Sequence, residues 1–215
     1  MFHLPNSTSV DRIIPKTKFY ERIQVSTAIR DEFTGIIGRI TWLHKLAPET
    51  LNIPTSDRVE ELQVFLIELK TKEVPLKALG VIDKAISYPI LFVLKCEESI
   101  CYIIQHKLDS KRRYYKTEWN QLPELSFTGS DLEAVYQRII TSFIAVDDGV
   151  SDASPDSLTT DKSFDEIVAT NVRREQLQKE ISALENKMRA EPQFNRKVEL
   201  NRELRRKIQE LSNLV

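Results

Sequence analysis

The first element that the hydrophobic pattern predicts is a helix. Ser26 or Thr27 is expected to cap it, because Ser and Thr accept hydrogen bonds from free backbone N–H groups at helix starts. Its apolar positions recur mainly at three- and four-residue steps: Ile29, Phe33, Ile36, Ile37 and Ile40. A strand from Ile40 to Leu46 is expected next, ended by Pro48, and a polar loop after it. No element is predicted before Ser26.

Two apolar runs in the middle of the chain predict a parallel pair of buried strands. Residues 62–70 are apolar at nearly every position until the end of the run, which is typical of a central strand covered on both faces. Ile90–Leu94 forms a second such run. Pro75 between them favours the start of a helix, with its apolar face formed by Leu76, Leu79, Ile82 and Ile86. This strand–helix–strand order predicts a right-handed parallel crossover.

The remaining core elements follow from shorter patterns. Ile100–Ile104 is expected to return antiparallel after a polar turn, and Tyr114, Tyr115 and Trp119 indicate an edge strand. A helix is expected to start at residues 129–131. Together these elements predict an α/β (mixed α+β) core domain with a mixed sheet over residues 1–145.

The pattern changes after the core. Residues 146–163 are polar and acidic, which predicts a flexible linker. Residues 164–215 hold two apolar heptad-like runs on either side of Pro192, so a C-terminal antiparallel, coiled-coil-like helical hairpin is expected. The alternative is one kinked helix that pairs with another chain. The residues expected to bind a partner are Leu177, Ile181, Leu184, Leu204, Ile208 and Leu211.

Composition narrows the cellular setting. The chain has 215 residues, 41% hydrophobic and 29% charged, and a formal net charge of −1, so no overall field attracts it to nucleic acid or membrane. The N-terminal segment lacks the pattern of a signal peptide, and no apolar run approaches membrane-spanning length. Its two cysteines form no disulfide framework. We expect a cytoplasmic protein without membrane contact.

Glu68 and Lys70 are the candidate catalytic pair. They lie two apart at the carboxyl end of a predicted strand, so both side chains should share one face. A Glu-X-Lys strand end resembles the last part of the PD-(D/E)XK nuclease motif, whose acid binds Mg²⁺. That motif needs a second acid, and the nearest ones, Glu49 and Asp57, fall in predicted loops. The alternative is a surface ion pair, and no metal or other cofactor is then expected.

A basic segment with aromatic residues runs from Lys107 to Trp119. Lys111, Arg112 and Lys116 are expected to face solvent and to contact DNA phosphates, if the protein contacts DNA at all. The alternative is that these charges only protect a sheet edge from aggregation. Three phosphate contacts are too few for tight binding by the free protein.

Several segments together resemble a bacterial family of unknown function, domain-of-unknown-function family 4391. The matching segments are residues 14–20, 42–50, 65–70, 82–86, 88–92, 117–119 and 193–201. The resemblance implies a gene neighbourhood with helicases and DNA methyltransferases, as in restriction–modification and phage-defence clusters. It implies no established activity.

Three hypotheses for function follow. The first is an accessory or assembly subunit of an anti-phage defence or restriction–modification-like complex, without catalytic activity of its own. It would act through contacts with protein subunits, a helicase or a DNA methyltransferase, and would reach DNA only through that complex. The second is a metal-dependent nuclease that uses Glu68 and Lys70. The third is a DNA-binding module that uses the basic segment.

Overall fold

The computed structural model describes residues 4–21, 25–147 and 162–214 and divides into two compact units, 1–158 and 159–215. Most of the expected linker, residues 148–161, lies outside the described residues. The first unit contains, in order, η1 (Asn6–Thr8), β1 (Ser9–Ile13), α1 (Thr17–Tyr20), α2 (Thr27–Asp31), η2 (Glu32–Ile36), β2 (Ile37–Leu46), α3 (Pro48–Leu51), β3 (Leu62–Leu69), α4 (Leu76–Ala85), β4 (Ile90–Cys96), β5 (Ser99–Gln105), β6 (Tyr114–Lys116) and α5 (Leu132–Asp147). The second contains α7 (Phe164–Ala190) and α8 (Phe194–Ser212).

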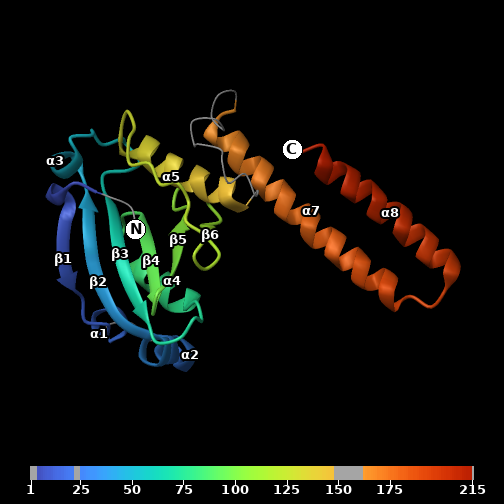
Figure 1. Cartoon of the computed structure of the whole chain (residues 1–215), viewed down its shortest axis with the longest axis horizontal. Coiled ribbons are helices and arrows are strands. Elements are labelled where there is room, and N and C mark those ends of the chain that lie inside the picture. The colour runs from blue at the N-terminus through green and yellow to red at the C-terminus, as the bar shows by residue number, and fades with distance from the viewer. Residues whose placement is uncertain (1–3, 22–24, 148–161, 215) are drawn as a thin grey trace. The chain divides into compact units, whose positions relative to one another are not determined.

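One mixed sheet organises the first unit (Figure 1). Its six strands lie in sequence order, β1-β2-β3-β4-β5-β6, and only β3 and β4 pair in parallel. The parallel pair follows from α4, which carries the chain back to the start of the sheet between the two strands. The predicted mixed α/β core, its strand–helix–strand unit and the antiparallel return of β5 are confirmed.

Both faces of the central strands are buried, as their apolar sequences require. One face, with Phe65, Ile67 and Phe92, joins the cluster that α4 covers through Leu79 and Ile82. The alternate residues point to the opposite face, where Val64, Leu91, Val93 and Ile104 are also buried. The buried side of α5 covers that second face with residues outside the first cluster: Leu132, Val135, Tyr136, Ile139, Ile140 and Phe143.

The N-terminal part departs most from the prediction. A strand and a short helix, β1 and α1, precede Ser26, where none was predicted. Ser26 does cap α2, and its hydroxyl accepts from the Ile29 N–H at 3.4 Å. The helix nevertheless ends before Ile37, because Ile37 pairs with Leu69 and starts β2 instead of extending the helix. For these β-branched residues, pairing with a central strand is more favourable than the helix that their spacing alone would favour.

Smaller corrections concern single residues. Leu76 is exposed and Ile86 lies past the end of α4, so the core side of that helix is Ala78, Leu79, Val81 and Ile82. Pro48 opens the short α3 where a loop was expected. Trp119 lies beyond β6, although it packs on the core. The final helix of the core continues to Asp147, two residues past the expected boundary.

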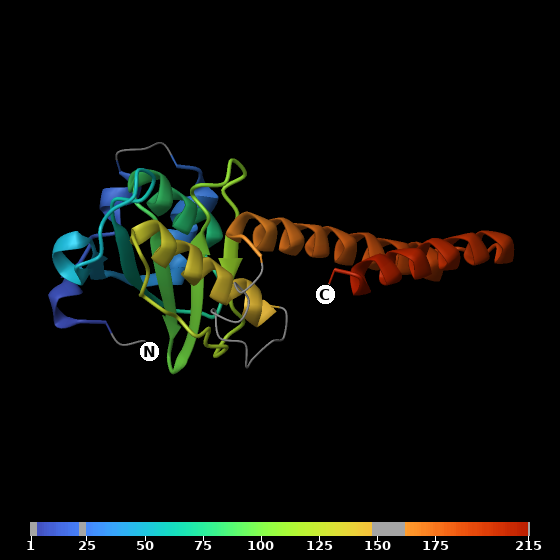
Figure 2. The ribbon, with the colours of Figure 1, turned by 90° about the horizontal axis from the view of Figure 1, so that it is seen from above.

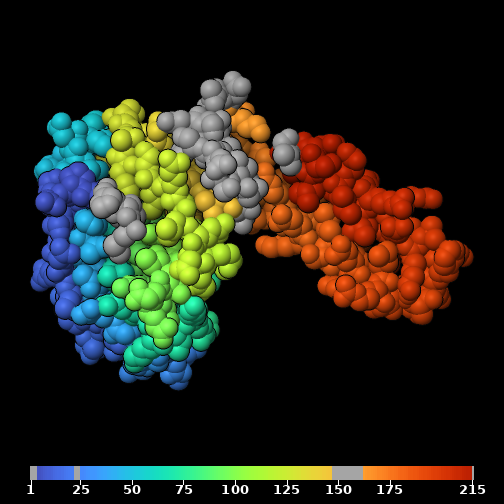
Figure 3. Space-filling view, in the orientation of Figure 1, coloured from blue at the N-terminus to red at the C-terminus, as the bar shows by residue number. Residues whose placement is uncertain are grey.

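The second unit is the predicted helical hairpin, with its turn at residues 191–193 around Pro192. Ser163 and Glu166 form a capping box at the start of α7. Two ion pairs join early α7 to late α8, Arg173 to Glu210 and Glu180 to Lys207, so the helices run antiparallel. Figure 1 shows the two helices side by side, Figure 2 shows them overlapping along the same line, and their surfaces adjoin in the space-filling view (Figure 3).

Candidate functional site

Glu68 lies near the end of β3 in a row of charged residues across three strands. Arg39 of β2 and Lys95 of β4 are its partners in strand register. The Arg39 guanidinium donates two hydrogen bonds to the Glu68 carboxylate, of which the Nη2–Oε1 bond is 2.7 Å. These bonds, together with the positive charges of Arg39 and Lys95, lower the pKa of Glu68. The carboxylate is therefore held ionised in a bidentate pair.

The other residues of the proposed nuclease site have separate partners. Lys70 lies one residue past β3, and its Nζ donates to the Thr34 carbonyl at 2.7 Å. Glu49 lies in α3 and pairs at 2.8 Å with Lys45, which is opposite Gln63 at the far end of the strand from Glu68. Within residues 4–21, 25–147 and 162–214, no three His, Cys, Asp or Glu side chains lie close enough together to hold a metal ion.

The most buried charges form a different cluster, which the sequence did not reveal. The Nζ of Lys107 donates to three backbone carbonyls at the end of α4 and just after it, those of Asp83, Ile86 and Tyr88, at 2.9, 2.5 and 2.7 Å. It also lies 3.5 Å from the Asp83 carboxylate. Because the Asp83 and Ile86 carbonyls lie at the negative end of the α4 dipole, Lys107 acts as a cap for this helix.

Tyr114 completes this cluster by donating a hydrogen bond from its hydroxyl to the Asp83 carboxylate. Burial raises the pKa of Asp83 and, together with the Asp83 charge, that of Tyr114, while burial lowers the pKa of Lys107. The side chain of Asp83 is only 1% exposed, so a substrate has no direct access to it. The cluster links α4 to β6 and to the β5–β6 connection, and we infer that its role is to stabilise the fold.

The basic segment is thereby divided into two parts. Lys107 is used inside the fold, whereas Lys111, Arg112 and Lys116 are exposed. Tyr115 is buried, and Tyr114 and Trp119 are partly buried against the core, so the aromatic residues of the segment serve packing. A nucleic acid could therefore contact only the three exposed charges of this segment, because its aromatic side chains pack on the core and are not available for base stacking.

The expected partner-binding residues of the hairpin are divided in the same way. Leu177, Leu184 and Leu204 are buried, which is where the interior of a two-helix hairpin needs them. Ile181 and Leu211 are half-buried. Ile208 is exposed, and so are Phe194 and Val198, which the partner-binding prediction did not include.

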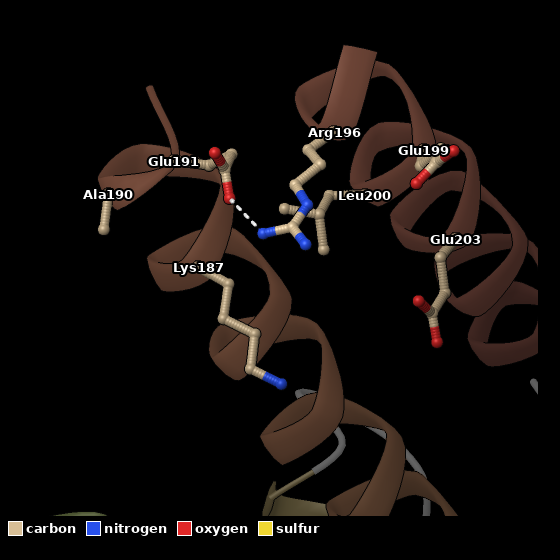
Figure 4. Close-up of a pocket in the computed structure, with 7 residues that line it drawn as sticks. All are labelled: Lys187, Ala190, Glu191, Arg196, Glu199, Leu200 and Glu203. Atoms are coloured by element: carbon tan, nitrogen blue, oxygen red, sulfur yellow. Dashed lines mark ion pairs between the residues drawn. The ribbon is translucent and has the colours of Figure 1, made fainter. Parts of the chain in front are cut away.

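A shallow groove lies at the turn end of the hairpin, with a volume of about 470 Å³ (Figure 4). Its lining comes from the last turn of α7 and the first turns of α8: Lys187, Ala190, Glu191, Arg196, Glu199, Leu200 and Glu203. Arg196 and Glu191 lie 3.9 Å apart across it. Charges of both signs surround one leucine, so the groove indicates no particular ligand.

Comparison with known proteins places the chain in a family. Residues 2–211 match the model of a domain of unknown function, DUF4391, and the chain belongs to that family. No curated protein and no solved structure matches it. In the part of the chain that the structure describes, no helix is both long and apolar enough to cross a membrane.

Proposed function

We propose that this protein is a cytoplasmic accessory or assembly subunit of an anti-phage defence or restriction–modification-like complex. The observation that carries the proposal is the helical hairpin, a compact unit of its own that has half of the large exposed apolar residues of the described chain on α8. Exposed apolar residues gathered on one helix of a small unit favour a protein–protein contact.

The charged sites favour this function over the alternatives. Glu68 is neutralised by Arg39 and has no carboxylate cluster around it among the described residues, which speaks against a divalent metal there. The exposed part of the basic segment supplies three charges without a stacking platform, which favours at most an auxiliary contact with DNA. The partners that the family resemblance suggests are a helicase and a DNA methyltransferase.

Purification of the tagged full chain from its native host tests this proposal. The expected result is that the product of a neighbouring gene, a helicase or a DNA methyltransferase, co-purifies in a fixed ratio. A full chain carrying Leu184→Asp and Leu204→Asp should lose that partner. Recovery of the wild-type chain alone would contradict the proposal.

A further inference from the structure

The α8 helix carries a stripe of exposed apolar residues on a face next to the one that packs on α7. Phe194, Val198 and Ile208 are 77%, 43% and 48% exposed. With Asn201 and Arg205 they continue steps of four, three, four and three residues, which places all five on one face of the helix. The side toward α7 is different, because there Leu204 is buried and Lys207 pairs with Glu180. We call Phe194, Val198, Asn201, Arg205 and Ile208 the α8 stripe.

The stripe differs from the other exposed apolar residues of the described chain. Ile13, Leu76 and Leu122 are the remaining large ones, and each belongs to a different segment of the first unit. Single exposed residues of this kind are normal on any protein surface. Three of them aligned over four turns of one helix are not explained by the packing of the hairpin.

The margins of the stripe are basic. Residues 194–212 contain six Lys or Arg and three Glu, although the whole chain has a net charge of −1. Lys207 and Arg196 are in ion pairs within the hairpin. Lys197, Arg202 and Arg205 are exposed beside or within the stripe and form no ion pair with any residue in the described ranges. Their positive charge is therefore unbalanced along the apolar surface.

We propose that the α8 stripe binds an amphipathic helix of a partner subunit, with an apolar seam flanked by Asp and Glu. Apolar residues at three- and four-residue steps fit the seam of a second helix, and charges beside a seam select partners of opposite sign. A second copy of this chain would instead place Lys197, Arg202 and Arg205 against like charges. Duplex DNA would use the charges but leave Phe194, Val198 and Ile208 in water.

This inference rests on the proposed function and names the chemistry of its interface. Photo-crosslinking of the full chain in its native host tests it. In one chain p-benzoylphenylalanine replaces Val198, and in the control it replaces Glu203, which is exposed on another side of the same helix. The expected result is a crosslink from position 198 to one partner segment that has apolar residues at three- and four-residue steps and an excess of Asp and Glu, with little product from position 203.

A double substitution measures how much the stripe contributes. Val198→Asp with Ile208→Asp should lower the amount of co-purified partner by about tenfold or more, because both changes put a charge into a desolvated contact. Ile13→Asp with Leu122→Asp alters two exposed apolar residues of the first unit and should leave that amount unchanged. Circular dichroism of each variant reports whether its helices remain folded.

Four outcomes overturn the inference. They are a crosslink from position 198 to lipid or DNA, a crosslink to a second copy or to the chain itself, a crosslinked partner segment without acidic flanks, and full retention of the partner by the folded Val198/Ile208 variant. In the last case the proposed function stands, because the wild-type chain still has its partner. If the wild-type chain co-purifies with no partner, the proposed function fails and this inference fails with it.

Discussion

At the residue scale, Lys107 and Lys111 show how one residue type takes two roles four positions apart. Lys107→Ala should destabilise the fold by about 3–5 kcal/mol, because it leaves three carbonyls at or just after the end of α4 and the buried Asp83 without their cation. Lys111→Ala, at an exposed position, should stay within about 0.5 kcal/mol of wild type. Urea unfolding measures both, and equal midpoints for the two variants would contradict the assigned role of Lys107.

The buried Asp83 carboxyl predicts a pH dependence. Burial raises its pKa in the folded state. Above about pH 3.9, where an unfolded Asp ionises, the folded protein therefore keeps a proton that the unfolded chain has released. The free energy of unfolding of wild type, relative to Asp83→Asn, should fall as the pH rises from about 4 through the raised pKa. Urea midpoints of both proteins over a pH series measure this difference, and a difference that rises with pH would refute it.

Glu68 and Lys70 lead to a prediction about chemistry. The purified protein with Mg²⁺ should not cleave DNA, because Glu68 is hydrogen-bonded to Arg39 and Lys70 to the Thr34 carbonyl. The Glu68→Ala and Lys70→Ala variants should therefore be as inactive as the wild type. A plasmid-cleavage assay with wild type and both variants checks it. Mg²⁺-dependent cleavage that disappears in Glu68→Ala would establish the nuclease alternative.

At the element scale, the parts that were predictable are those whose local pattern and tertiary environment agree. Residues 62–70 and Ile90–Leu94 are apolar on both faces, and both faces are buried by helices. The first forty residues were not predictable in the same way. The helical spacing of Ile36, Ile37 and Ile40 competes with strand pairing to β3, and only the folded sheet shows which prevails. Likewise, β1 is exposed along most of its length and therefore lacks an apolar signal.

Substitutions in the interior and on the surface of the hairpin should have different effects on its helix content. Leu184→Asp with Leu204→Asp places charges between α7 and α8, where even truncation to Ala typically removes about 2–5 kcal/mol per leucine. This pair should reduce the helical circular dichroism signal, whereas the exposed Val198→Asp should leave it unchanged. If the Leu184/Leu204 variant keeps full helicity and thermal stability, the assignment of these leucines to the hairpin interior is wrong.

The basic segment from Lys107 to Trp119 predicts a DNA contact that forms only in the assembled complex. In the assembled complex, reversal of Lys111, Arg112 and Lys116 to Glu should weaken DNA binding without releasing subunits, and should reduce the salt slope by about 2.7. Reversal of Lys72, Lys77 and Lys84, also exposed, is the control with equal charge change. Filter binding over a salt series distinguishes the two. If the Lys111, Arg112 and Lys116 reversal leaves the DNA affinity and its salt slope unchanged, the charges of this segment only protect a sheet edge.

At the scale of the whole molecule, the hairpin was predictable from the sequence, but the packing of its individual residues was not. The hairpin was predicted from its two apolar runs, but which residues face inward depends on how α7 and α8 pack together. Leu204 is therefore buried, whereas Ile208, one turn later, is exposed. The Asp83–Lys107–Tyr114 cluster joins residues up to 31 positions apart and has no local signature, so only the fold could reveal it.

The central claim is that this chain works through assembly and not through chemistry of its own. Native mass spectrometry of the complex purified from the host tests that claim most directly. For the wild-type chain we predict a mass equal to the 24.9 kDa chain plus an identified partner in a fixed ratio. For the Val198→Asp, Ile208→Asp chain we predict mainly a folded protein of 24.9 kDa alone. A wild-type chain found only as free monomer, or only as its own oligomer, would contradict it.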